Sequence, residues 1–313
     1  MNNSKRKTVE YGKYGYIFIL PFFIIFFIFQ FYPLIYTFWT SLSYREQVGR
    51  GTINYVFGLG NYTNYVFTSG SEVFQAMGIT VLLWLVNFIP QIILSLLLAA
   101  WFTDEHNKLK GQGAYKVLMY MPNIITAATI AVLFYSLFDV SGSMTGLLRN
   151  MGILSADSDI LKAGWWSFGL IAFIQFWMWY GNTMIVLIAG IMGISPSLYE
   201  AAMVDGASSR QQFFLITLPL LKPILQFTLV TSAIGGLQMF DIPQLFNEGK
   251  PIIKIGEQSV LSTQTIVMLI KKYVDAGPAQ NYGRASAYSV VLFVITLAVS
   301  MVFYVATSEK KGR

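Results

Sequence analysis

Six long apolar segments divide the chain, and their length is the feature that most constrains its fold. They cover about residues 16–40, 76–102, 114–138, 165–193, 220–243 and 285–307. A helix needs roughly 20 apolar residues to cross a hydrocarbon core about 30 Å thick, because its backbone groups must be satisfied inside the helix. None of the six shows the alternation over about ten residues that a membrane β-strand requires. The sequence therefore predicts an all-α integral membrane protein with six transmembrane helices.

Composition agrees with a membrane location and excludes several kinds of site. Of 313 residues, 55% are hydrophobic and 12% are charged, whereas about a quarter of the residues in a soluble domain are charged. Cysteine is absent, so the chain can form neither a disulfide nor a thiolate metal site. The single histidine, His106, lies in a hydrophilic run and cannot build a zinc site alone. The first apolar segment is too long for a removable signal peptide and is predicted to stay as an anchor.

The positions of lysine and arginine predict the orientation, because these residues concentrate on cytoplasmic segments. With six spans and the N-terminus inside, most of them fall on inner segments or on the span ends beside them, and the formal net charge of +6 lies there. We therefore expect cytoplasmic tails at residues 1–15 and 308–313, around a single membrane domain at residues 16–307. The positive charge then faces anionic lipid, and no nucleic acid partner is needed to explain it.

The outer connections are long, at about residues 41–75, 139–164 and 244–284, which predicts an extracytoplasmic partner or vestibule. In the last of them, apolar residues alternate with Lys271 and Lys272 at a helical spacing. This pattern predicts a short amphipathic helix on the rim of the bundle. Packing onto the chain's own bundle explains such a helix as well as contact with a partner does.

One inner connection, residues 195–219, has the pattern of a short cytoplasmic helix. Pro196 ends the preceding span, because proline cannot continue a helix, and Ser197 is suited to starting the next one. Glu200 falls in the first turn, where a negative charge suits the positive end of the helix dipole. Gly206 can end the helix by taking a left-handed conformation.

The residues of this short helix are suited to contact with another protein. Ala201 and Ala202 allow a close approach, and Glu200 and Asp205 offer carboxylates to arginines across an interface. We therefore predict a docking site formed by Glu200, Ala201, Ala202, Asp205 and Gly206. The alternative is a plain connector at the membrane surface with acidic caps.

The same segment resembles the EAA loop of permease subunits in binding-protein-dependent ABC importers. The resemblance rests on Glu200-Ala201-Ala202, Asp205-Gly206-Ala207, Ile216, Leu218-Pro219 and Pro223. Other segments resemble the carbohydrate branch of that family, the maltose-type and glycerol-phosphate-type permeases. These segments are residues 18–21, 32–36, 58–62, 237–243 and 282–287. The resemblance therefore covers nearly the whole chain.

This resemblance implies a type I ABC importer permease fold of the MetI-like kind, in the plasma membrane of a prokaryote. It implies a heterodimer with a second, homologous permease, two cytoplasmic ATPase subunits and an extracytoplasmic solute-binding protein that delivers a sugar. Residues 200–206 would be the coupling helix that contacts the ATPase. The chain has no G-x-x-x-x-G-K-[ST] phosphate loop, so ATP and Mg are expected on the ATPase. The chain itself is expected to be no enzyme and to hold no cofactor or metal.

Polar side chains inside a membrane bundle usually face a cavity or another helix, and several lie within the predicted spans. The candidates for a substrate path are Asn87, Gln91, Asn123, Gln175, Trp177, Tyr180, Asn182, Gln238 and Asp241. Such a set suits sugars, because amides pair with hydroxyls in both directions and aromatic rings cover apolar sugar faces. The alternative is that the amides only bridge helices and the rings only mark the membrane interface.

Three other functions remain compatible with the sequence. A secondary transporter would need ion-coupling carboxylates within its spans, and no acid lies clearly inside one. A membrane enzyme would need a nucleophile, a metal site or an acid–base pair, and only scattered Ser, Asp and Glu residues are present. An ABC permease for another small solute, such as glycerol phosphate or an amino acid, would share the docking loop. Only the resemblance at Asn61, Asp241 and Tyr282 favours sugars over these solutes.

Overall fold

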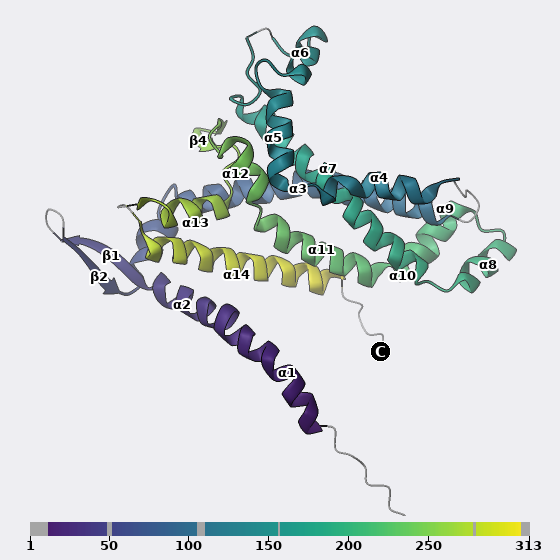
Figure 1. Ribbon diagram of the computed structural model, residues 1–313, viewed down its shortest axis with the longest axis horizontal. Coiled ribbons are helices and arrows are strands. Elements are labelled where there is room, and N and C mark those ends of the chain that lie inside the picture. Colours follow the sequence, from purple (N-terminus) through teal and green to yellow (C-terminus); the bar gives the residue numbers. More distant parts are fainter. Residues whose placement is uncertain (1–11, 49–51, 105–109, 156, 278–279, 308–313) are drawn as a thin grey trace, which may run out of the picture.

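The computed structural model describes residues 12–48, 52–104, 110–155, 157–277 and 280–307. Most of this part of the chain is helical, and six helical segments are long and apolar enough to cross a membrane (Figure 1). These segments are Tyr14–Ser41, Glu72–Thr103, Ala127–Asn150, Gly164–Met192, Lys222–Asn247 and Tyr282–Thr307. The predicted fold class is thus confirmed. His106 and nearly all of both predicted tails lie outside the described residues.

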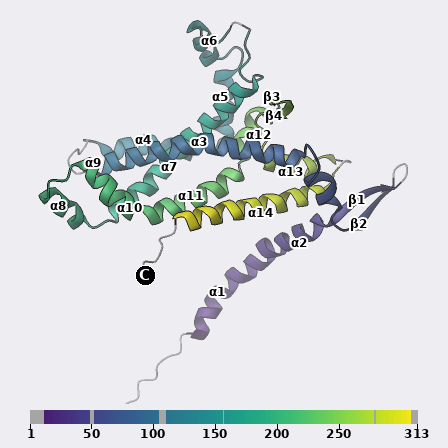
Figure 2. The same ribbon diagram turned by 180° about the vertical axis from the view of Figure 1, so that it is seen from behind.

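The first predicted span is a continuous helical segment that diverges from the bundle. It consists of α1 (Gly12–Phe26), a π-helical stretch η1 (Phe27–Phe31) and α2 (Tyr32–Ser41). The α2 part packs against α14 (Tyr282–Thr307), where the ring centroids of Phe38 and Phe293 lie 5.9 Å apart. Figure 2 shows α1 running away from the other helices. As a result, this span buries none of its most apolar stretch within the chain.

The centre of the bundle is formed by the two longest helices, α3 (Glu72–Thr103) and α7 (Gly164–Met192), which pack along each other. α4 (Gln112–Ile124) packs on α7, and α11 (Lys222–Leu237) packs on α14. The α4–α7 crossing is close because α7 carries Gly181 there. A Cβ atom on Gly181 would lie 2.1 Å from the carbonyl oxygen of Met119 in α4. A small residue at this position is what lets the two backbones approach.

Two of the predicted spans are interrupted. Residues 114–138 form α4 and α5 (Ala127–Phe138), separated by extended backbone at Ile125 and Thr126. The Thr126 hydroxyl caps α5 by accepting a hydrogen bond from the Thr129 amide at 3.3 Å. Residues 220–243 likewise do not form one helix, because α11 ends at Leu237 and a new helix, α12 (Asp241–Asn247), follows a turn.

The outer connections contain structure that the sequence did not predict in full. Two antiparallel hairpins supplement the helices, and their partners include Ser43 with Phe57 and Ile252 with Leu261. The amphipathic rim helix is confirmed as α13, which packs on α14. The outer elements are β1 (Ser43–Val48), β2 (Thr52–Phe57), η2 (Tyr62–Val66), α6 (Ser143–Asn150), β3 (Ile252–Ile255), β4 (Gln258–Leu261) and α13 (Ile266–Val274).

An arginine near the start of α14 joins several outer elements. The guanidinium carbon of Arg284 lies 4.1 Å from the ring centroids of both Tyr65 and Tyr273. Its Nη2 atom lies 3.8 Å from the Glu72 carboxylate, which also accepts a hydrogen bond from the Tyr273 hydroxyl at 2.8 Å. Burial and this hydrogen bond raise the pKa of Tyr273, so its hydroxyl stays a donor. The cluster Tyr65, Glu72, Tyr273 and Arg284, here the outer clamp, ties η2, α3, α13 and α14 together.

The connection between α7 and α11, which is predicted to be cytoplasmic, lies at one end of the bundle. It consists of α8 (Pro196–Val204), α9 (Ser209–Gln212), a π-helical stretch η3 (Phe213–Thr217) and α10 (Leu218–Leu220). Figure 1 shows α8 at the end of the bundle opposite the β1–β2 hairpin. The predicted inner helix and the hairpin of the first predicted outer loop therefore lie at opposite ends of the bundle, and the orientation of these ends in the membrane remains a prediction.

The close α4–α7 crossing predicts unequal effects of two glycine substitutions in α7. Gly181→Ala should destabilise the protein by about 1–3 kcal/mol, because the added methyl group overlaps the backbone of α4. Gly169→Ala is the matched control, because a Cβ atom there meets nothing within 4 Å. Thermal unfolding of the purified protein in detergent measures both. Equal melting temperatures for the two variants would contradict the close approach of α4 to α7 at Gly181.

Candidate functional site

A polar cavity of about 580 Å³ lies where α3, α7 and α11 meet the start of α12. Both helix interruptions border it, since Ile125 and the turn from Gln238 to Phe240 are part of its wall. Most of its polar groups are amides and hydroxyls. The polar residues of the lining are Asn87, Gln91, Asn123, Gln175, Asn182, Thr183, Thr228, Thr231, Ser232, Gln238 and Asp241. Its aromatic residues are Trp84, Trp179, Phe227 and Phe240.

Most of the residues proposed for a substrate path are brought together in this cavity. The ones that line it are Asn87, Gln91, Asn123, Gln175, Asn182, Gln238 and Asp241. They come from four helices and one turn, so only the fold places them side by side. Their location fits the predicted role, and the role itself remains a prediction.

Trp177 and Tyr180 do not line this cavity, and their role in the path remains a prediction. The Trp177 ring packs on Phe134, with centroids 5.6 Å apart, and Tyr180 lies 5.8 Å from the ring of Phe176. Helical periodicity is the reason, since the cavity-facing residues of α7 follow one stripe. The stripe consists of Gln175, Met178, Trp179, Asn182, Thr183 and Val186. Trp179 is the aromatic residue that sequence reasoning missed, and its spacing from the two amides could have found it.

Hydrogen bonds divide the amides of the lining into two groups. Gln91 donates from Nε2 to the Thr183 hydroxyl at 2.8 Å, which joins α3 to α7. Asn87 donates from Nδ2 to the carbonyl of Leu83 at 2.7 Å. Gln91 therefore bridges two helices, whereas the bond of Asn87 stays within α3. A second group makes no recorded side-chain hydrogen bond to the described residues, and its members are Asn123, Gln175, Asn182 and Gln238. The amides of this second group are available to a ligand.

The predicted inner helix is α8, and its C-terminal end matches the sequence argument. It begins at Pro196, however, so that Glu200 lies in its second turn and not in the first as predicted. Pro196 occupies its first turn, and Gly206 follows it with a φ of +78°. The Ala207 amide donates back to the Ala202 carbonyl at 2.8 Å, which completes a glycine-based helix cap. Ser195 precedes the helix, although its hydroxyl pairs with that of Ser197 at 2.8 Å and not with the backbone. α8 is therefore a defined helix and not an irregular connector.

α8 exposes most of its surface, and a hydrogen bond on its bundle side holds it in place. None of its residues is buried, and Val204 is 88% exposed. Glu200, Ala201 and Asp205 are exposed as well. On the bundle side, the Tyr199 and Thr217 hydroxyls pair at 2.9 Å. This arrangement leaves the acidic and small residues of α8 free to meet another protein.

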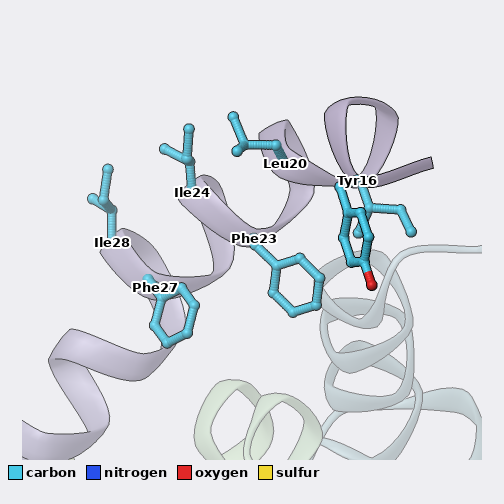
Figure 3. Close-up of a pocket in the computed structure, with 7 residues that line it drawn as sticks. Tyr16, Leu20, Phe23, Ile24, Phe27 and Ile28 are labelled. Carbon is cyan, nitrogen blue, oxygen red and sulfur yellow. The ribbon is translucent and has the colours of Figure 1, made fainter. Parts of the chain in front are cut away.

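A second hollow, of about 540 Å³, lies along α1, and its lining is almost entirely apolar. Figure 3 shows that its side chains all come from one helix. The lining residues are Tyr16, Ile19, Leu20, Phe23, Ile24, Phe27 and Ile28. The hollow is therefore a ridged helix surface, suited to packing against another apolar surface.

The family follows from comparison with known proteins. The model of the family described as "binding-protein-dependent transport system inner membrane component" matches residues 15–311. The chain belongs to this permease family. The match covers all six spans, the cavity and α8, so both candidate sites lie within the family's common region.

Relatives of the permease match it over almost its full length. The lactose transport system permease protein LacF of Rhizobium radiobacter is 30% identical, over 99% of this chain and 100% of the relative. The trehalose/maltose transport system permease protein MalF of Thermococcus litoralis is 30% identical, over 97% of each. The sn-glycerol-3-phosphate transport system permease protein UgpA of Agrobacterium fabrum is 28% identical, over 91% of each.

A solved structure has the same fold. It is a bacterial ABC transporter involved in the import of the acidic polysaccharide alginate, and one of its chains superposes with a TM-score of 0.71. That chain is 21% identical to the permease, and the match covers 96% of each. A second alginate transporter structure, with a TM-score of 0.71, was solved in complex with a pentasaccharide-bound periplasmic protein. This likeness shows the fold, and the family match together with the six apolar helical segments indicates a multi-pass membrane protein.

The two groups of amides predict different effects of substitution. Gln91→Ala should lower the stability of the permease by about 0.6–1.7 kcal/mol, because it removes a bond between α3 and α7. Gln175→Ala should lower stability by less than Gln91→Ala does, because it removes no hydrogen bond to a described residue, although Gln175 is buried. Unfolding in detergent measures both losses. A larger loss for Gln175→Ala than for Gln91→Ala would overturn the division.

Proposed function

We propose that the permease forms, with a second homologous permease, the path by which a sugar or oligosaccharide enters the cell in an ATP-driven importer. The observation that carries this proposal is the cavity between α3, α7 and α11. Unpaired amides there can donate to and accept from sugar hydroxyls, and the exposed ring of Trp179 offers a flat apolar face. The names of the lactose and trehalose/maltose relatives support the same substrate class.

The proposed energy source is a pair of cytoplasmic ATPase subunits docked on α8 and on its counterpart in the second permease. Support comes from the exposed Glu200, Ala201 and Asp205 and from the absence of a phosphate loop in the sequence. ATP and Mg would therefore bind the ATPase, and this chain would hold no cofactor and act as no enzyme. The N- and C-termini share the cytoplasmic side with α8 in this orientation, in the plasma membrane of a prokaryote.

α8 is placed to act as a lever on the cavity. It continues directly from α7, which carries Gln175 and Asn182, and it is followed by α9, η3, α10 and then α11. When the ATPase dimer closes, α8 would move toward its counterpart and tilt both helices, since a short anchored helix transmits a rigid-body shift. The cavity would then open outward, and a binding protein docked on the outer elements would release its sugar there. The alginate transporter solved with its periplasmic protein supports this partner.

The second permease is the proposed cover of α1. Tyr16, Leu20 and Phe23 project from a helix whose described side chains are all exposed, and together they form an apolar ridge (Figure 3). The other spans bury part of their apolar surface against the chain itself, whereas this span buries none of its most apolar window. A neighbouring helical subunit would bury this ridge through van der Waals packing.

The coupling role of α8 is tested by Glu200→Ala and by Gly206→Pro, each in the reconstituted importer. The first removes the carboxylate offered to the ATPase, and the second forbids the φ of +78° that ends the helix. Each variant should lower ATP-dependent uptake at least about tenfold, the equivalent of 1.4 kcal/mol of lost coupling. Glu257→Ala, at an exposed acid in the β3–β4 turn, is the matched control and should transport normally. Normal uptake by both α8 variants would refute the coupling role.

The contact of α1 with a second permease is tested by crosslinking. Because the chain has no cysteine, Phe23→Cys provides one thiol on the ridge for a photoactivatable reagent. Illumination of membranes that contain both permeases should join this chain to the second one, as identified by mass spectrometry. Membranes with this chain alone provide the control. An adduct with lipid only, in the complete importer, would show that bilayer and not protein covers the ridge.

A further inference from the structure

Three exposed aromatic residues form a stripe that runs from the predicted outer end of the first span onto the β1–β2 hairpin. The ring centroids of Trp39 in α2 and Phe57 in β2 lie 5.1 Å apart. Tyr55 precedes Phe57 by two positions and shares its face of the hairpin, because the side chains of a strand alternate between faces. Trp39, Tyr55 and Phe57, here the aromatic stripe, are 63%, 71% and 60% exposed.

The two faces of the hairpin differ in polarity. Glu46 and Asn54 are partners across the strands on the face opposite the stripe, and both are exposed. On that same face, nearer to α2, Tyr44 packs over Gly60, where an added Cβ atom would lie 2.5 Å from the Tyr44 ring. The hairpin is therefore amphipathic, with its exposed aromatic side chains on one face and its exposed polar ones on the other.

The hairpin is fixed to the end of α2, so the stripe has a defined direction. The Asn61 Nδ2 atom, which is fully buried, donates to the carbonyls of Ser41 at 2.8 Å and Ser43 at 3.0 Å, across the junction of α2 and β1. Farther out, the Arg45 Nη1 atom donates to the Gln280 carbonyl at 2.8 Å, just before α14. Figure 2 shows the hairpin continuing from α2. These contacts hold the hairpin in one orientation relative to the first span.

The length of the first span determines the depth of the stripe in the membrane. The span Tyr14–Ser41 has 28 residues, which at about 1.5 Å per residue is about 42 Å. This exceeds the hydrocarbon core of about 30 Å even at a tilt of about 40°. A span centred on the core therefore brings Trp39, near its end, into the headgroup layer. Trp and Tyr are enriched at this depth, because their rings are apolar and also carry a polar group.

We propose that the aromatic stripe is a membrane anchor, with Trp39, Tyr55 and Phe57 lying in the phospholipid headgroup layer and Glu46 and Asn54 facing water. The decisive observation is continuity, because the stripe begins on an exposed face of a membrane span and extends that face onto the hairpin. The anchor holds the end of the first span at a fixed depth, although the chain leaves the most apolar stretch of this span unburied. This inference goes beyond the import function and is independent of the solute that is carried.

The accessibility of a spin label distinguishes lipid from water at the stripe. Tyr55→Cys and Asn54→Cys place single thiols on opposite faces of β2, since the chain has no cysteine. Each variant is labelled before the importer is assembled in phospholipid vesicles. Electron paramagnetic resonance then measures collisions with oxygen, which partitions into lipid, and with a water-soluble nickel complex. The ratio of oxygen to nickel collisions should be several-fold higher at position 55 than at position 54, and equal ratios would overturn the proposal.

The same label reveals a protein that covers the stripe. A label at position 55 that is shielded from both oxygen and nickel without any binding protein would show that another subunit packs there. Shielding that develops only when the binding protein is added would show that this protein docks on the stripe. Either result would refute the membrane anchor. Phe57→Cys repeats the measurement at a second stripe position if the Tyr55→Cys chain fails to assemble.

Removal of the other two rings tests whether the stripe acts as the anchor. Trp39→Ser together with Phe57→Ser, added to Tyr55→Cys, should lower the oxygen-to-nickel ratio toward that of position 54, because the hairpin loses its apolar contact with lipid. Val56→Ser is the matched control, since Val56 is an exposed apolar residue on the opposite face, and it should leave the ratio unchanged. An unchanged ratio in the double-serine variant would contradict the anchoring role.

Discussion

The need to satisfy every backbone polar group inside lipid is the constraint on which this structure depends. It requires long helices, and it allows a helix to stop within the membrane only where protein or a polar cavity surrounds the break. In the described part of the chain, two of the spans predicted from the sequence are interrupted, at Ile125 and Thr126 and at the turn from Gln238 to Phe240. Residues of both border the same cavity. The helix breaks therefore form part of the cavity wall. The break after α11 also places Asp241 in that wall.

The two ends of the bundle differ in how firmly they are held. At the outer end, the clamp around Arg284 joins η2, α3, α13 and α14 through stacked rings and a shared carboxylate. At the inner end, α8 has no buried residue and is held through a few hydrogen bonds, such as the one between Tyr199 and Thr217. Because α7 runs from the cavity to within three residues of α8, we expect a movement at α8 to reach the cavity. This asymmetry is what a lever requires.

Hydrophobicity and helix-ending residues made much of this fold predictable. The spans follow from segment length, and α8 follows from Pro196 and Gly206, whose backbone conformations are restricted or unusual. The break at Ile125 and Thr126 was not predictable in this way, because both residues are tolerated within an apolar helix. The outer clamp could not be predicted from the sequence either, because its members Glu72 and Tyr273 lie 201 positions apart in the chain. In the cavity, Trp177 and Tyr180 were candidates and Trp179 was not, although the helical period starting from Gln175 leads to Trp179, which lines the cavity.

The central claim is that α8 controls which side of the membrane the cavity faces. Asn182 lines the cavity from α7 and makes no recorded side-chain bond, so Asn182→Cys in this cysteine-free chain reports access to it. The measurement is the reaction of that thiol with a membrane-impermeant reagent applied from the outer side, with and without ATP under conditions that block hydrolysis. The account predicts protection without ATP and reaction with it. Equal reaction in both states would contradict it.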